Sequence, residues 1–197
     1  MKKGVLLVVS GPSGSGKGTI LNILKKEKNI SVAVSATTRK PRSGEIDGIH
    51  YHFMSRERFL DQIATNNILE YNEYCGNLYG TMRSEIESHL NRGKSVILEI
   101  DVNGAQKISD SMDCVKIFIL PPSIEILKQR LFLRGTETRE SIRNRIDQAY
   151  KEIEKACYYD YIVVNAVLDQ AVEKIRSILD TEILKKNRIK INIDNSI

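Results

Sequence analysis

Residues 10–19 read SGPSGSGKGT, and they directly follow a short apolar run, VLLVV, at residues 5–9. The apolar run is typical of a β-strand that is buried on both faces. Four glycines in the next ten residues allow a tight turn in which successive backbone N–H groups point into one concavity. Residues 19–28 then carry apolar side chains with helical spacing. A glycine-rich turn between a buried strand and a helix predicts a phosphate-binding loop, whereas an ordinary strand-to-helix turn would be the structural alternative.

Lys17 stands where a lysine reaches the β and γ phosphates of a nucleotide. One position departs from the usual pattern, in which a serine or threonine directly after the lysine binds Mg²⁺. Here Gly18 follows the lysine and Thr19 comes next. The Mg²⁺ ligand therefore stays open between Thr19 and a metal held through waters and the phosphates. The residues expected to contact the nucleotide are Gly11, Pro12, Ser13, Gly14, Ser15, Gly16, Lys17, Gly18 and Thr19.

Further apolar runs alternate with helical patterns along the chain. The strand-like runs are residues 31–35, 96–100, 115–120 and 161–164, and the helical patterns are residues 83–91, 124–131 and 168–184. This alternation predicts an α/β fold with a central parallel sheet between layers of helices, the three-layer fold of phosphate-loop NTPases. Such sheets bind their ligands beyond the carboxyl ends of the strands.

Two stretches interrupt the alternation. Residues 37–79 are rich in turn residues and aromatic side chains, which predicts an insert with its own small sheet. Residues 134–145 are dense in Arg and Glu, which indicates a solvated, mobile flap between helices. One domain is predicted at residues 4–184, with a core at 1–34, 84–122 and 154–185, an insert at 35–83 and a helical lid at 123–153. A frayed polar tail is predicted at 186–197.

Composition narrows the class of protein. The 197 residues include 30 Lys and Arg, 25 Asp and Glu, three Cys and three His, so the net charge is +5. The cysteines are too few and too widely spaced for a disulfide scaffold or a zinc module. No apolar run approaches the roughly 20 residues of a membrane span, and no signal peptide is evident, so a cytoplasmic protein is expected. The mild positive charge fits nucleic acid or small phosphorylated substrates equally well.

A second anion site is predicted in the insert. Arg39 and Arg42 flank Pro41 in a stiff turn that Glu45 follows. A planar guanidinium binds phosphate oxygens with two donors, so two of them on one loop favour a phosphate site separate from the glycine loop. A charged surface turn is the alternative interpretation.

Other residues of the insert and the core have the right chemistry to recognise a nucleotide base. Glu70 lies among apolar neighbours, and its carboxylate could accept from both N1–H and N2 of a guanine, a donor pair that adenine lacks. Tyr51 and Tyr79 could donate to a phosphate or simply pack in the core. Glu99 and Asp101 end a buried strand, where acidic groups organise Mg²⁺ and its waters or cap the next helix.

A third group of cations comes later in the chain. Arg130, Arg134, Arg139 and Arg145 could close over transferring phosphates and neutralise developing charge, or could form salt bridges on a solvated helix. Asn165 directly follows the last predicted strand, where it could touch a base or serve as a turn residue.

Taken in order along the chain, these motifs resemble the guanylate kinase family from Gly4 to about Leu184. The motifs are GPSGSGK at 11–17, SATTRKPRSGE at 35–45, GNLYGT at 76–81, EIDVNG at 99–104 and RGTET at 134–138. Glu99 stands where the family usually has Asp, and Thr81 stands where it often has Ser. Both substitutions keep the functional group, a carboxylate and a hydroxyl.

The resemblance implies roles for individual residues. Ser35, Glu70, Thr81 and Asp101 would meet the guanine of GMP. Arg39, Arg42, Tyr51 and Tyr79 would hold its phosphate, with Glu45 and Glu99 beside them. Lys17, Arg134 and Arg145 would act on the transferred phosphoryl group, while Arg130 and Asn165 would contact ATP.

The resulting hypothesis is phosphoryl transfer from ATP, with Mg²⁺ as cofactor, to GMP and dGMP, giving the diphosphates in purine nucleotide metabolism. The expected partners are these small molecules, without nucleic acid or membrane, for a monomer or homodimer. A scaffold domain that binds phosphopeptides, a kinase of another small acceptor and a nucleic-acid binder are the competing hypotheses. The scaffold domains tend to lose the loop lysine and the flap arginines, both of which this chain keeps.

Overall fold

The computed structural model describes residues 4–74, 76–133, 139–185 and 188. Its main sheet has five parallel strands in the order β2-β7-β1-β8-β9. The strands are β2 (Ile30–Val32), β7 (Ser95–Glu99), β1 (Leu6–Ser10), β8 (Val115–Leu120) and β9 (Tyr161–Val164). The predicted runs are thus confirmed as neighbours in one parallel sheet, except that the run at 31–35 contributes only its first two residues to β2 and residues 33–35 lie outside the strand. The phosphate loop leaves the middle strand, with the carboxyl ends of β7 and β8 on either side.

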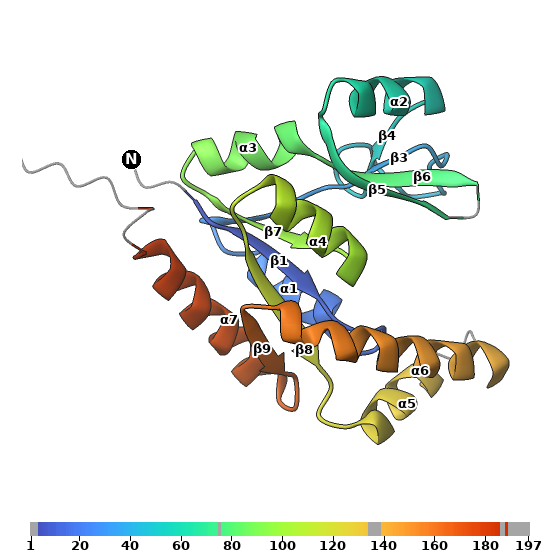
Figure 1. Ribbon diagram of the computed structural model, residues 1–197, viewed down its shortest axis with the longest axis vertical. Coiled ribbons are helices and arrows are strands. Elements are labelled where there is room, and N and C mark those ends of the chain that lie inside the picture. Colours follow the sequence, from blue (N-terminus) through green and yellow to red (C-terminus); the bar gives the residue numbers. More distant parts are fainter. Residues whose placement is uncertain (1–3, 75, 134–138, 186–187, 189–197) are drawn as a thin grey trace, which may run out of the picture.

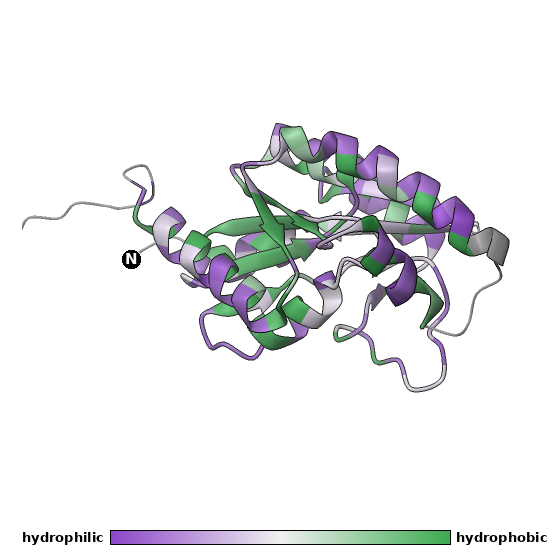
Figure 2. Ribbon diagram, turned by 90° about the horizontal axis from the view of Figure 1, so that it is seen from below, coloured by the Kyte–Doolittle hydropathy of each residue, from purple (hydrophilic) through white to green (hydrophobic). Residues whose placement is uncertain are grey.

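Helices cover both faces of this sheet because β1 is apolar on both sides. Leu7 and Val9 pack with α1 and α7, whereas Leu6 and Val8 pack with α3 and α4. These helices are α1 (Lys17–Leu24), α7 (Leu168–Ile183), α3 (Arg83–Asn91) and α4 (Val102–Ser111). Figure 2 shows the strands as a hydrophobic centre between helices whose outer faces are hydrophilic. The predicted three-layer α/β architecture is confirmed.

A second sheet of four strands, in the order β4-β3-β6-β5, stands apart from the first (Figure 1). It is made of β3 (Ala36–Thr37), β4 (His52–Phe53), β5 (Ile68–Tyr74) and β6 (Asn77–Met82), and α2 (Arg56–Ala64) covers it. Its own small core contains Ala36, Phe59, Ile68 and Leu78. The predicted insert with a separate sheet is therefore confirmed, although α2 was not anticipated.

The lid region differs from its prediction. Residues 139–145 were expected in a flap between helices, but they form the first turns of α6 (Arg139–Glu154). The signal was hidden by the charged residues: Ile142, Ile146 and Ala149 make an apolar stripe that packs against Leu127 and Leu131. The last two belong to α5 (Ile124–Phe132), which Ser123 caps as its position after Pro122 suggested. A short 3₁₀ helix, η1 (Lys155–Tyr158), follows α6 directly.

Two predicted segments fall outside the described residues. One is RGTET at 134–138, and the other is most of the tail at 186–197. Arg188 is described, and its guanidinium bonds the buried carboxylate of Glu182 at 2.7 Å, so the chain just beyond α7 is attached to the core. None of the helices in the described part of the chain has the length and apolar character needed to span a membrane.

Candidate functional site

The phosphate loop is shaped by glycine at positions that other residues could not occupy. Gly16 caps α1 at φ 93°, and a Cβ there would lie 2.2 Å from Nδ2 of Asn165. Gly11 has φ 146°, and a Cβ there would lie 2.2 Å from the carbonyl oxygen of Ile119. Both left-handed conformations and both close approaches therefore require glycine. The loop's backbone is consequently drawn against the ends of β8 and β9.

Lys17 begins α1 and its ammonium group turns back over the loop. Its Nζ donates to the carbonyl oxygens of Gly11, at 2.5 Å, and Pro12, at 3.2 Å. The charge is thus held at the centre of the loop's concavity, beside the N-terminus of α1. The helix N-terminus adds unpaired N–H groups and a positive dipole end, so this point attracts phosphate.

Three side chains from other elements hold the loop in place. The Asn165 amide donates to the carbonyl oxygen of Ser15 at 2.8 Å, and Arg130 donates to the same oxygen at 3.4 Å. Arg130 also donates to the Asn165 carbonyl oxygen at 3.1 Å. Arg145 of α6 donates to Oγ of Ser13 at 2.8 Å. The structure therefore places all three predicted residues at the loop, while Arg134 lies outside the described residues.

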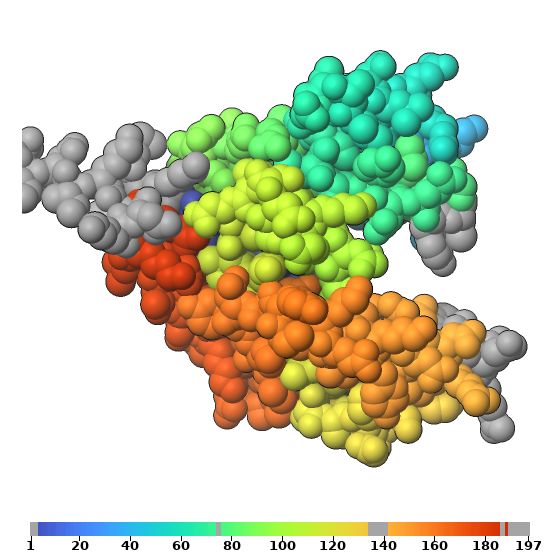
Figure 3. All heavy atoms as spheres, in the orientation of Figure 1, coloured from blue at the N-terminus to red at the C-terminus, as the bar shows by residue number. Residues whose placement is uncertain are grey.

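A cavity of about 520 Å³, the phosphate pocket, opens over this loop. Its floor is the loop itself, and its walls carry Tyr51 of the insert, Glu152 of α6, and Glu99 and Asp101 from the end of β7. Burial raises the pKa of Glu152, although a hydrogen bond from Gln148 and the charge of Lys17 oppose the shift. The space-filling view shows the surface hollowed between the insert and α6 (Figure 3).

Thr19 does not line the phosphate pocket. It lies in an adjoining cavity of about 450 Å³ that also contains Arg130, Leu133 and Asn165. Gly14 and Gly16 line both cavities, so a molecule bound along the loop could extend from one into the other.

The predicted arginine turn is an ion-paired structure. Arg39 donates to Oε1 of Glu45 at 2.8 Å, and the backbone N–H of Arg42 donates to Oε2 of the same carboxylate at 2.7 Å. These two hydrogen bonds lower the pKa of Glu45 to about 2. The Arg39 guanidinium lies 5.5 Å from the ring centroid of Tyr51, whose ring meets that of Tyr79 edge to face. Glu45 thus holds the guanidinium of Arg39 and the backbone of Arg42, and both of its carboxylate oxygens accept hydrogen bonds within the turn.

The acceptor pocket, a cavity of about 300 Å³, lies between the insert and the end of β7. Its lining residues are Ser35, Tyr51, Glu70, Asn72, Tyr79, Gly80, Glu99, Ile100 and Asp101. Glu70 is only 7% exposed and accepts from the Thr81 hydroxyl at 2.7 Å. Burial raises the pKa of Glu70, and the Thr81 hydrogen bond opposes this only in part. Two oxygen acceptors, at Glu70 and Asp101, therefore face one small cavity.

Asp101 uses both carboxylate oxygens. Oδ1 caps α4 by accepting from the N–H groups of Asn103, at 2.9 Å, and Gly104, at 2.8 Å, as the helix-cap interpretation expected. Oδ2 accepts from the Asn72 amide at 3.1 Å. The predicted acid is thus fixed by α4 on one side and by β5 of the insert on the other.

Asn72 and Glu152 line these pockets but were missing from the predicted site. Asn72 lies two residues after Glu70 on a strand, so the two side chains share a face. Glu152 lies seven residues, or about two helical turns, after Arg145 on α6. The sequence spacing could have predicted both residues as part of the site, but only if Glu70 and Arg145 were already assigned to it and the strand and helix were predicted correctly. The individual roles of the predicted residues stay predictions.

Comparison with known proteins agrees with this geometry. The protein-family model "Guanylate kinase" matches residues 3–182. The chain is 51% identical to a guanylate kinase of Clostridium perfringens, strain SM101, over 193 residues that cover 97% of this chain and 89% of the relative. It is 50% identical to a guanylate kinase of Clostridium tetani, over 98% of this chain and 93% of the relative.

Solved structures include a similar fold. The crystal structure of guanylate kinase from Anaplasma phagocytophilum matches with a TM-score of 0.74 and 36% sequence identity, covering 95% of this chain and 90% of that one. With the family model spanning nearly the whole sequence, this protein belongs to the guanylate kinase family.

Proposed function

We propose that the protein transfers the γ-phosphoryl group of ATP to GMP, giving ADP and GDP. One observation carries the proposal beyond family membership. The phosphate pocket and the acceptor pocket share Tyr51, Glu99, Ile100 and Asp101 as lining residues, so they are two ends of one cleft. A donor on the glycine loop and an acceptor beside Glu70 would meet at these shared residues.

The chemistry requires positioning more than proton transfer. The attacking group is a phosphate oxygen of GMP that is already ionised at neutral pH, so no strong general base is needed. Two anions must nevertheless approach each other closely, and cations must neutralise the charge that develops. Lys17 and Arg145 contact the glycine loop and would act at the donor end. Arg39 and Arg42 are assigned to the acceptor phosphate by their motif, which is supported by the 5.5 Å between the Arg39 guanidinium and the ring of Tyr51. Arg134 is assigned to the donor end by its motif alone.

Hydrogen-bond acceptors in the acceptor pocket would select guanine over adenine. Glu70 would accept from N1–H and N2 of the base, while Thr81 keeps the carboxylate oriented through their 2.7 Å hydrogen bond. Ser35 and Asp101 line the same cavity and would complete the contacts. We extend the proposal to dGMP because none of these residues is assigned to the ribose.

The donor set fits Mg²⁺ held through water. Among the described residues, no three His, Cys, Asp or Glu side chains form a cluster for direct coordination. Glu99, Asp101 and Glu152 do line the phosphate pocket, and hydrated Mg²⁺ is commonly held by acidic residues beside nucleotide phosphates. Mg²⁺ would supply neutralisation of the β and γ phosphates. Thr19 lines the other cavity and is the weaker candidate for a direct ligand.

A coupled assay for ADP release tests the proposal across AMP, GMP, CMP, UMP and dGMP. We expect GMP to give the highest kcat/KM, and Lys17→Met to lose at least about 100-fold in turnover, since each 1.4 kcal/mol of lost stabilisation costs tenfold. Lys25→Met, an exposed residue at the end of the same helix, is the matched control and should keep its activity. Equal rates with several acceptors, or an active Lys17→Met variant, would contradict the assignment.

A further inference from the structure

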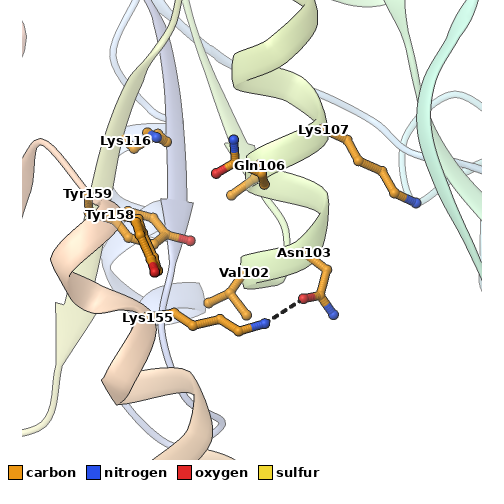
Figure 4. A pocket seen from close by; sticks show the side chains of 9 residues that line it. Val102, Asn103, Gln106, Lys107, Lys116, Lys155, Tyr158 and Tyr159 are labelled. Carbon is orange, nitrogen blue, oxygen red and sulfur yellow. Dashed lines mark hydrogen bonds between the residues drawn. The ribbon is translucent and has the colours of Figure 1, made fainter.

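A separate cavity of about 320 Å³ lies between α4 and η1, next to β8 (Figure 4). We call it the α4–η1 cavity. Its wall includes Val102, Ala105, Gln106, Lys116, Tyr158 and Tyr159. None of its lining residues lines the phosphate pocket, the acceptor pocket or the cavity that contains Thr19. It is thus outside the machinery assigned to phosphoryl transfer, and its volume is that of a small-ligand pocket.

The inner wall of the α4–η1 cavity is apolar and partly aromatic. Val102 and Ala105 of α4 are 9% and 2% exposed, and Tyr159 packs against the apolar clusters to which they belong. The Tyr159 ring packs edge to face on Phe118 with centroids 5.0 Å apart, so its orientation is fixed. Tyr158 remains 67% exposed, which leaves its ring available to a ligand. Such a wall favours a flat apolar body.

The rim carries positive charge. Of the described lining residues, three are lysines and none is acidic. Figure 4 shows Lys155 reaching from η1 toward Asn103 on α4, where its Nζ donates to Oδ1 at 2.8 Å. Lys107 points away from the tyrosine pair and donates to the Tyr71 carbonyl oxygen at 3.3 Å. Lys116 and Lys155 therefore supply the charge at the cavity, and an anionic group is the complementary ligand.

The Tyr159 hydroxyl adds a second observation. Its oxygen is buried, and the buried hydroxyl of Ser10, at the end of β1, is its hydrogen-bonding neighbour. Burial raises the pKa of Tyr159 to about 12, with the nearby Ser10 hydroxyl opposing the shift, so the group remains a donor at neutral pH. The hydroxyl therefore links the wall of the cavity to the end of β1, and the ring is the part of Tyr159 that the ligand would contact.

We propose that the α4–η1 cavity binds a small organic anion with a planar apolar body, and that this molecule regulates turnover. Two contacts connect the cavity to the active site. Lys155 directly follows α6, and its hydrogen bond to Asn103 joins the base of α6 to the helix that Asp101 caps. Tyr159 lies near Ser10, the last residue of β1 before the phosphate loop. A ligand anion competes with Asn103 for Lys155 and so loosens the link between α6 and α4.

Isothermal titration calorimetry with naphthalene-2-sulfonate tests the binding step. The protein is first saturated with GMP and a non-hydrolysable ATP analogue, so that the substrate pockets are filled. We expect one probe molecule to bind, and uncharged 2-naphthalenemethanol to bind at least tenfold more weakly. Gln106→Trp, an exposed position that fills the cavity, should abolish binding, and Lys116→Gln should weaken it about tenfold. Lys174→Gln, on an exposed face of α7, is the matched control and should bind normally.

Steady-state GMP kinase rates then test the regulatory step. The probe should change the rate of the unmodified protein at least twofold and leave the Gln106→Trp variant unaffected. Absence of binding, equal binding of the uncharged compound, or unchanged binding to both Gln106→Trp and Lys116→Gln would overturn the site. Normal binding without an effect on rate would overturn its regulatory role. The rate measurement depends on the proposed function, whereas the binding measurement does not. If the probe bound but the protein had no GMP kinase activity, the proposed function would be contradicted and the binding site would stand.

Discussion

The two anion sites of this protein are built from different parts of the chain. The phosphate loop is local: ten consecutive residues, two of them glycines that no other residue could replace, create a concavity from backbone N–H groups. The acceptor pocket draws side chains from β5, β6 and the end of β7, and Glu70 is held in it by Thr81. The arginine turn that the motif assigns to the acceptor phosphate is likewise held by a side-chain pair, Arg39 with Glu45. A change in the backbone shape of the phosphate loop should therefore cause a large loss of ATP binding in one step. Removal of one side chain from the acceptor site should weaken GMP binding only by the contact that is lost.

Gly16→Ala should give the largest loss. The added Cβ would stand 2.2 Å from Nδ2 of Asn165 at a φ of 93°, so both the backbone and its support must shift. Strained backbone alone costs on the order of 1–3 kcal/mol, and with the clash we expect kcat/KM for ATP to fall about 100-fold or more. Steady-state kinetics at varied ATP measures this loss.

Gly18→Ala is the matched control for that prediction. A Cβ at Gly18 meets no atom within 4 Å, and the residue lies in α1, where alanine is favoured over glycine by about 1 kcal/mol. Because Gly18 lines the phosphate pocket, the control applies to the melting temperature, which should be unchanged or slightly higher, while Gly16→Ala should lower it. Equal losses of melting temperature from both substitutions would mean that the loop does not depend on the conformation of Gly16.

Glu70→Gln should give a smaller, selective loss at the acceptor site. The amide keeps the volume but replaces one acceptor with a donor, which opposes the guanine donors and disturbs the Thr81 hydrogen bond. A charge-assisted hydrogen bond contributes about 1.5–3 kcal/mol, so the preference for GMP over AMP should fall about 10- to 100-fold with ATP kinetics preserved. Glu73→Gln, on the same strand but half-exposed and paired with Arg56, should change neither value. Unchanged selectivity in Glu70→Gln would make Glu70 a structural residue.

The same contrast explains what the sequence could predict. The phosphate loop and the parallel strands follow from neighbouring residues, so their identity and order could be read directly. The insert was recognisable as a separate sheet, but its pairings were not: Asn72 meets Asp101, 29 positions away, only because β5 docks beside α4. The sequence predicts a helical lid, but it assigns the first turns of α6 to a flap, because the buried stripe of Ile142, Ile146 and Ala149 is interspersed with charged residues and only packing on α5 selects that stripe.

The acceptor site should also respond to pH. Burial raises the pKa of Glu70, so its carboxylate takes up a proton at a higher pH than an exposed glutamate does. Protonation removes the acceptor for guanine N1–H, so KM for GMP should rise as pH falls through that raised pKa, by at most about tenfold per pH unit. The pKa of Glu70 is higher in the folded than in the unfolded protein. The free energy of unfolding of the ligand-free protein should therefore increase as the pH falls from that raised pKa to the ordinary pKa of a glutamate. The phosphate of GMP also takes up a proton, with a pKa of about 6, so GMP titrations from pH 8 to 5 should show a rise in KM that is larger in the unmodified protein than in Glu70→Gln.

Asn72→Ala should give the smallest effect. The variant removes one hydrogen bond to Asp101 while the α4 cap, which uses the other carboxylate oxygen, remains. A net hydrogen bond contributes about 0.5–1.5 kcal/mol, so KM for GMP should rise about two- to tenfold with kcat and the melting temperature nearly unchanged. Asn72→Asp tests whether the charge at this position matters. A third carboxylate beside Asp101 and Glu70 should raise KM for GMP further and make KM sensitive to salt. If both variants kept the normal KM, Asp101 would be positioned by its helix alone, and the acceptor site would depend less on side-chain pairs than the structure indicates.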